Sequence, residues 1–137
     1  MTRVDFYVLQ DAAARNRDVL ACRLAEKAWL DGLHVYIQAD SIEHVRTLDD
    51  LLWTFRDRSF VPHATELDAA PVCIGCDGGN STAHEVLINL GAMVPSFFSR
   101  FDRVLEIING DAAVREAGRN RFKFYRDRGY PLDTHNL

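Results

Sequence analysis

The stretch RVDFYVLQDAAARNRDVLACRLAEKAWLDGLHVYIQA, residues 3–39, decides the fold. Its two ends, residues 3–9 and 33–39, are rich in branched and aromatic side chains, which favour β-strands. Between them, apolar side chains recur every three or four residues from 13 to 30, and Gly32 follows as a typical helix terminator. This order of strand, helix and strand predicts two parallel strands joined by a helical crossover.

The alternation of strands and helices continues to the end of the chain. Two more helices are predicted at residues 42–55, with Ser41 as the N-cap, and 111–128. Apolar runs predict strands at 72–76, 85–90 and 103–108, and a short helical piece is expected at 95–100. The pattern predicts an α/β fold, a three-layer Rossmann-like sandwich with a mostly parallel sheet of about five strands and helices on both faces.

Length and composition are those of an ordinary globular domain. The chain has 137 residues, of which 47% are hydrophobic and 26% charged, so we expect residues 1–137 to form one domain. No apolar run approaches the ~20 residues that span a bilayer, and the N-terminus lacks the pattern of a signal peptide. We therefore expect a cytoplasmic protein that does not associate with membranes.

The three cysteines suggest neither disulfides nor a metal site. An odd number of cysteines without a secretory signal favours reduced thiols. Cys73 and Cys76 have C-x-x-C spacing, but no histidine pair completes a zinc site at the usual spacing, and a redox pair normally sits at a helix N-terminus. Because the run PVCIGC resembles a strand, we expect buried, inert thiols and no metal.

No catalytic or cofactor motif is recognisable. The turn after the first predicted strand, residues 10–15, contains no glycine, so the dinucleotide-binding fingerprint is absent, and no phosphate loop of the G-x-x-x-x-G-K type occurs. The segment most similar to a phosphate loop, GCDGGNST at residues 75–82, lacks the lysine and is interpreted as a flexible connection. We expect no catalytic residues and no cofactor, although an enzyme assembled from residues distant in sequence stays open.

The charge distribution singles out the C-terminal helix. The net charge of the chain is -4, but residues 115–128 carry six basic and two acidic side chains, a local balance of +4. An uneven charge distribution of this kind often marks the binding site of a charged partner. At 100° per residue, one arc of about 100° contains five side chains, here named the basic stripe. The basic stripe consists of Arg115, Arg119, Phe122, Lys123 and Arg126.

Three interpretations of the basic stripe are open from the residues alone. An acidic peptide with an aromatic anchor would use arginines for its carboxylates and the floor beside Phe122 for its ring. Nucleic acid would use the same cations for phosphates, although the acidic remainder of the chain would repel it. A solvated basic face needs no partner, and Arg126 and Arg128 also suit the negative end of the helix dipole. The dipole does not account for Arg115 or Arg119.

Four sequence blocks carry a resemblance to a known family. They are DFYVL at 5–9, LDDLLW at 48–53, SFVPH at 59–63 and RFKFYR at 121–126, the last followed by Gly129-Tyr130. Over essentially its whole length the chain resembles the chi subunit of bacterial DNA polymerase III holoenzyme. The family usually has tyrosine where Phe122 stands, which keeps the ring and loses a hydroxyl.

The resemblance implies a non-catalytic α/β accessory subunit associated with the clamp loader. Such subunits bind the acidic, phenylalanine-terminated tail of single-stranded DNA-binding protein, and this role would fall on Arg119 with the rest of the basic stripe around it. A contact with the psi subunit would fall on Trp53 and Phe60. Nucleic acid would be bound only indirectly or weakly. The alternatives are a direct nucleic-acid-binding α/β protein and a small nucleotide-using enzyme.

Overall fold

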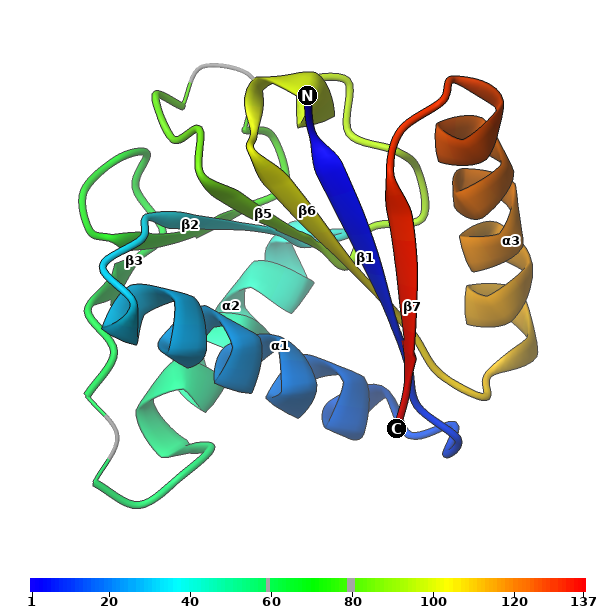
Figure 1. Cartoon of the computed structure of the whole chain (residues 1–137). Helices are drawn as coiled ribbons and strands as arrows, with labels where there is room; N and C mark the ends of the chain where they lie inside the picture. Colours follow the sequence, from blue (N-terminus) through cyan, green and yellow to red (C-terminus); the bar gives the residue numbers. More distant parts are fainter. Residues whose placement is uncertain (59, 79–80) are drawn as a thin grey trace.

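The computed structural model describes residues 1–58, 60–78 and 81–137 and contains a seven-stranded sheet, in which every pair of neighbouring strands is parallel. The strand order is β3-β4-β2-β5-β6-β1-β7 (Figure 1). The strands are β1 (Arg3–Val8), β2 (Val35–Gln38), β3 (His63–Ala64), β4 (Val72–Gly75), β5 (Val86–Asn89), β6 (Arg103–Ile108) and β7 (Leu132–Asn136).

Helices cover both faces of the sheet, which confirms the predicted three-layer α/β sandwich. The helices are α1 (Ala14–Leu30), α2 (Ile42–Thr54), the short 3-10 helix η1 (Phe98–Arg100) and α3 (Ala112–Asp127). Figure 1 shows α1 and α2 together on one side of the sheet and α3 on the other. Ser41 caps α2 as predicted, because its hydroxyl accepts a hydrogen bond from the backbone N–H of His44 at 3.1 Å.

Side chains that alternate along the strands form two hydrophobic cores. On the α1 and α2 face, Ile37 and Ile88 are completely buried against alanines and leucines of the helices. On the α3 face, Phe6 and Leu87 pack with Tyr125 and with aromatic residues of the β5–β6 connection. Because every central strand is buried on both faces, the strands read as continuous apolar runs, as in other parallel sheets.

The sheet has two strands more than the sequence indicated, one at each edge. β3 is only two residues long, and β7 has the sequence LDTHN, in which every side chain after Leu132 is exposed. A polar, exposed edge strand carries no apolar alternation to predict it. β7 is held instead by specific contacts, since His135 lies 3.1 Å from the Asp5 carboxylate and stacks on Tyr7 with ring centroids 4.7 Å apart.

The cysteines only partly match the expectation of buried thiols. Cys22 and Cys73 are buried, but Cys76 is exposed, so the expectation is wrong at that position. Cys76 comes directly after the last residue of β4, where the chain leaves the sheet. Burial, with a smaller contribution from Asp18, raises the pKa of the Cys22 thiol to about 12, and this group therefore stays protonated.

The glycines at the end of β4 and in the connection after it have a packing role that the sequence did not reveal. Tyr36 is completely buried, and its ring and hydroxyl occupy the space where side chains at Gly75 and Gly78 would otherwise lie. Any larger residue at either glycine would collide with the Tyr36 ring or hydroxyl. Residues 79 and 80 of this connection lie outside the described residues.

Candidate functional site

Helix α3 is fixed to the sheet at its first turn and at one close contact. The Asp111 carboxylate accepts a hydrogen bond from the backbone N–H of Val114 at 3.1 Å and so caps the helix. Gly118 is buried, and any side chain there would collide with Ile108 at the end of β6. The missing side chain therefore lets α3 lie close to β6.

A buried polar network holds the same face of α3. Glu106 of β6 is completely buried and accepts hydrogen bonds from Arg121 Nε at 2.9 Å, Tyr125 Oη at 2.8 Å and Asn89 Nδ2 at 3.0 Å. Arg121 Nη1 also donates to the Ala92 carbonyl at 2.9 Å. Burial, followed by the negative charge of Glu106, raises the pKa of Tyr125, so the hydroxyl remains a donor.

This network corrects the charge count made from the sequence. Arg121 was one of the six basic residues between 115 and 128, yet it is only 3% exposed and is paired with Glu106. Its charge is therefore neutralised inside the protein and is not available to a partner. The basic surface of α3 consists of the other cations.

The basic stripe is a surface feature, as its helical geometry predicted. Its four cations, Arg115, Arg119, Lys123 and Arg126, are all exposed, and Phe122 is half-buried. Among the described residues, Arg115, Arg119 and Lys123 form no ion pair. Arg126 lies 3.2 Å from Asp127, but both side chains are well exposed, so this contact is weak.

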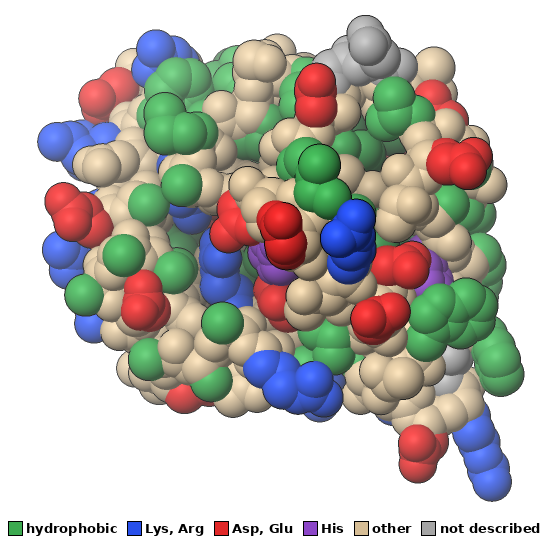
Figure 2. Space-filling model, turned by 180° about the vertical axis from the view of Figure 1, so that it is seen from behind, with side chains coloured by type: hydrophobic (Ala, Val, Ile, Leu, Met, Phe, Trp, Pro, Cys, Tyr) green, Lys and Arg blue, Asp and Glu red, His purple; other side chains and the backbone are tan. Residues whose placement is uncertain are grey.

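The contacts of α3 show which way the basic stripe faces. On one flank of the helix Arg121 reaches toward β5 and β6, whereas on the other flank the Phe122 ring lies 5.2 Å from the Phe6 ring of β1. The basic stripe is on the Phe122 flank, and therefore on the side of β1 and the edge strand β7. Figure 2 turns this side of the molecule to the left, where Lys and Arg side chains stand along the margin with a few acidic ones between them.

Just beyond the basic stripe, Arg128 is engaged with the protein itself. Its guanidinium carbon lies 3.6 Å from the centroid of the Phe124 ring, and Nη1 donates to the Phe124 carbonyl at 3.4 Å. This cation–π contact at the end of α3 fits the structural role that the helix dipole suggested for Arg128.

The second pair of predicted site residues lies at the opposite edge of the sheet. Trp53, near the end of α2, is 61% exposed, and Phe60 is 75% exposed. The Trp53 ring lies 4.7 Å from the ring of His63, the first residue of β3. The side chains of Trp53 and Phe60 are therefore accessible to a partner, and large aromatic side chains often serve as anchors of protein interfaces. Ser59, within the SFVPH block, lies outside the described residues.

A crevice at the carboxyl ends of the strands tests the nucleotide-binding alternative. It has a volume of about 520 Å³ at the point where β1 and β6 send their connections to opposite faces, the usual ligand position in such folds. Two nitrogens of Arg17 are already bonded to the carbonyls of Ile107 and Leu90. Four carboxylates line the crevice, those of Asp18, Asp40, Glu43 and Asp111. This environment would repel the phosphates of a nucleotide.

The same crevice contains a histidine whose charge should affect stability. His44 Nε2 lies 2.8 Å from Asp18, and Nδ1 lies 3.1 Å from Asp40. Burial opposes the charged form, but the hydrogen bond to Asp18 and the charges of Asp18 and Asp40 outweigh it, so the pKa of His44 is raised above its usual 6.5. Arg17, whose own pKa is lowered by burial, also faces His44 and partly opposes the shift.

The folded state binds the proton of His44 more tightly than the unfolded state does. The resulting stabilisation is therefore complete below pH 6.5 and is lost as the pH rises through the raised pKa of His44. Urea unfolding at several pH values measures the free energy of unfolding of the wild type and of His44→Gln. As the pH rises from 6.5 through the raised pKa of His44, the wild-type value should fall by about 1 kcal/mol relative to that of the variant. A pH-independent difference between the two proteins would contradict the His44–Asp18 pairing.

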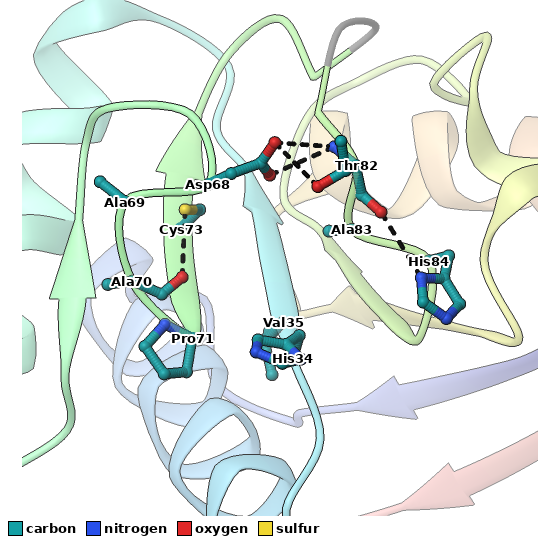
Figure 3. Close-up of a pocket in the computed structure, with 10 residues that line it drawn as sticks. All are labelled: His34, Val35, Asp68, Ala69, Ala70, Pro71, Cys73, Thr82, Ala83 and His84. Atoms are coloured by element: carbon teal, nitrogen blue, oxygen red, sulfur yellow. Dashed lines mark hydrogen bonds between the residues drawn. The ribbon is translucent and has the colours of Figure 1, made fainter.

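Figure 3 shows a cavity at the amino ends of the strands, where hydrogen bonds join two connections. The cavity has a volume of about 470 Å³ and lies between the connections that precede β4 and β5. The Asp68 carboxylate accepts hydrogen bonds from the N–H and hydroxyl of Thr82, both at 2.9 Å (Figure 3). It also accepts one from the Ser81 hydroxyl at 2.7 Å. These hydrogen bonds lower the pKa of Asp68 and join the two connections. Among the described residues, no cluster of histidine, cysteine and carboxylate side chains could hold a metal ion, and no helix is long and apolar enough to cross a bilayer.

Comparison with known proteins identifies relatives along the whole chain. The model of the family described as "DNA polymerase III chi subunit, HolC" matches residues 1–133. The DNA polymerase III subunit chi of Pseudomonas aeruginosa is 45% identical over 139 aligned positions, which cover 100% of this chain and 98% of the relative. The corresponding subunit of Haemophilus influenzae is 30% identical, covering 96% and 95%, and that of Escherichia coli is 27% identical, covering 98% and 97%.

A solved structure supports the fold alone. The crystal structure of T4 UvsW aligns with a TM-score of 0.64 over 98% of this chain and 42% of that protein, at 13% sequence identity. An α/β architecture of this kind serves many unrelated functions, so the likeness carries no functional argument.

Proposed function

Since the chain belongs to the DNA polymerase III chi subunit family, we propose that it links single-stranded DNA-binding protein to the replicase as a non-catalytic subunit of the clamp-loader assembly. One surface binds the acidic C-terminal tail of single-stranded DNA-binding protein, and another binds the assembly. The protein works in the cytoplasm, where replication takes place, and needs no cofactor.

The observation that carries the tail-binding proposal is the exposed basic stripe, in which Arg115, Arg119 and Lys123 form no ion pair with any described residue. Arg115, Arg119 and Lys123 stand on one flank of α3 within the reach of neighbouring carboxylates of one peptide. The half-buried ring of Phe122, packed on Phe6, offers an apolar floor for a terminal phenylalanine. Arginines bind carboxylates bidentately, and several such contacts around a desolvated anchor can give micromolar affinity, roughly -8 kcal/mol.

The contact with the assembly is proposed at Trp53 and Phe60, with the psi subunit as the partner. Both side chains are exposed and available to a partner. The Trp53 ring packs against the His63 ring, and this contact holds the tryptophan side chain in one orientation. Buried tryptophans at interfaces often dominate the binding energy. This surface lies beside β3, at the far edge of the sheet from β7, so both partners can bind at once.

Direct nucleic-acid binding is the weaker alternative. Burial of Arg121 leaves fewer cations on the surface than the sequence suggested, while the chain as a whole keeps its net charge of -4. A nucleic-acid groove combines several cations with exposed aromatic faces for stacking. In the basic stripe the single ring, Phe122, is half-buried against Phe6.

Titration calorimetry with a peptide of the acidic tail tests the tail-binding proposal. Arg119→Ala is expected to weaken binding about tenfold, because it removes a charge-assisted contact worth about 1.4 kcal/mol. Arg23→Ala is the matched control, since Arg23 is an exposed arginine on α1, on the other side of the sheet, and its loss changes the net charge equally. Binding should weaken as salt is raised.

Equal affinities for wild type and Arg119→Ala would reject the assignment. Fluorescence anisotropy with a labelled oligonucleotide separates the alternative. Tight oligonucleotide binding without single-stranded DNA-binding protein would favour a direct nucleic-acid binder. A rise of the melting temperature with ATP or NAD would favour a nucleotide-using enzyme.

A further inference from the structure

The edge strand β7 presents unpaired backbone groups beside the basic stripe. It is hydrogen-bonded on one side only, to β1, with register from Val4↔Leu132 to Val8↔Asn136 and no bulge. The N–H of Val4 donates to the Pro131 carbonyl at 3.0 Å, and the N–H of Leu137 donates to the Val8 carbonyl at 3.0 Å. The backbone N–H and C=O groups of the odd-numbered residues of β7 therefore point toward β1. Those of Leu132, Thr134 and Asn136 point away from the sheet.

Nothing on β7 blocks this outer edge. Proteins usually protect edge strands with a lysine, an internal proline, a bulge or a covering element. β7, LDTHN, has none of the first three, and its side chains from Asp133 to Asn136 are exposed. Pro131 precedes the strand. An open edge of five residues in register is long enough to pair with an extended peptide.

The two faces of β7 differ in charge. Because side chains alternate, Leu132, Thr134 and Asn136 share the α3 face with Phe6, and Leu132 packs against the core there. The acidic side chain, Asp133, lies on the opposite face, where it is 3.8 Å from Arg3. An acidic strand added at this edge would thus have the basic stripe on the α3 face, while the carboxylate of Asp133 lies on the other face.

The spacing of the two elements also matches. Alternate side chains of an extended peptide are about 6.8 Å apart. Cations four residues apart on a helix, such as Arg119 and Lys123, are separated by about 6 Å along the axis. Successive carboxylates on the α3 face of the added strand can therefore pair with successive cations of the basic stripe.

We infer that the acidic tail binds by strand addition: it extends the sheet as an eighth strand along β7, with its carboxylates on the α3 face turned toward the basic stripe. This inference rests on the proposed function and specifies how that site holds the peptide. The backbone of β7 supplies sequence-independent affinity, and the basic stripe with Phe122 supplies selectivity for an acidic, aromatic-terminated tail.

A series of tail peptides, each with one N-methylated amide, tests the inference by calorimetry. An added strand turns alternate N–H groups toward β7, so affinity should fall about tenfold or more at every second position and change little at the positions between. In the protein, Thr134→Pro removes an outward N–H and should weaken binding similarly, whereas Thr134→Ala keeps that N–H and should bind within about twofold of wild type. Circular dichroism and thermal unfolding check that both variants fold.

The outcomes separate the two levels of the proposal. A periodic loss with the N-methylated peptides, together with weaker binding by Arg119→Ala, supports strand addition. Tolerance of N-methylation at every position, with Arg119→Ala still impaired, would overturn strand addition and leave the tail-binding function standing. Unchanged binding by Arg119→Ala would overturn both. If Thr134→Pro does not fold, the peptide series decides alone.

Discussion

Glu106→Ala is expected to lower the free energy of unfolding by about 3–5 kcal/mol, because it leaves the buried guanidinium of Arg121 without its counter-charge. Tyr125 and Asn89 lose an acceptor at the same time. The network joins β5, β6 and α3, so its loss should loosen the helix that carries the basic stripe. Urea denaturation followed by circular dichroism measures the change.

Two variants control for this prediction. Glu116→Ala removes an exposed carboxylate from α3 and should stay within about 0.5 kcal/mol of wild type. The double variant Glu106→Leu/Arg121→Met removes both buried charges and should lose less than Glu106→Ala alone, because apolar replacement of a whole buried pair is often near neutral. A loss below about 1 kcal/mol for Glu106→Ala would show that the network contributes little to stability.

Trp53→Ala should weaken binding to the psi subunit at least about thirtyfold, or about 2 kcal/mol, if Trp53 is an interface anchor. Protein stability should change little, since 61% of the side chain is already exposed. Calorimetry with purified psi subunit, or co-purification of the clamp-loader assembly from the native cells, measures the loss. Met93→Ala serves as the control, because Met93 is 78% exposed in the β5–β6 connection, away from β3.

Retention of wild-type affinity by Trp53→Ala would place the contact with the assembly elsewhere. Loss of affinity together with a large loss of stability would instead mean that Trp53 supports α2 and β3. Tail-peptide binding gives an independent reference, since it should be unaffected by Trp53→Ala.

The sequence predicted the parts of this molecule that repeat locally. Helical periodicity was sufficient for α1, α2 and α3, and dense apolar runs were sufficient for the central strands. It was also sufficient to gather the basic stripe on one flank of one helix. The resemblance suggested an interface role for Trp53 and Phe60, but the residue pattern alone did not predict their exposure, because a large aromatic side chain fits a core and an interface equally well.

What the sequence did not show depends on contacts between distant residues. Arg121 looked like its basic neighbours, and only the placement of Glu106 on the strand beneath distinguishes it as a buried partner. β7 has no apolar pattern and is held by Asp5, Tyr7 and backbone pairing with β1. Gly75 and Gly78 resembled a flexible loop, and their role emerges from the position of Tyr36.

The strand order has a mechanical consequence for a protein gripped at both sheet edges. Six interstrand steps separate β3 from β7, so the two grips are about 29 Å apart across the sheet. Tension between them would run at right angles to the strands and load every ladder of backbone hydrogen bonds in series. The β3–β4 ladder has only two paired positions, against six between β1 and β6, so a load carried by β3 itself would separate this ladder first.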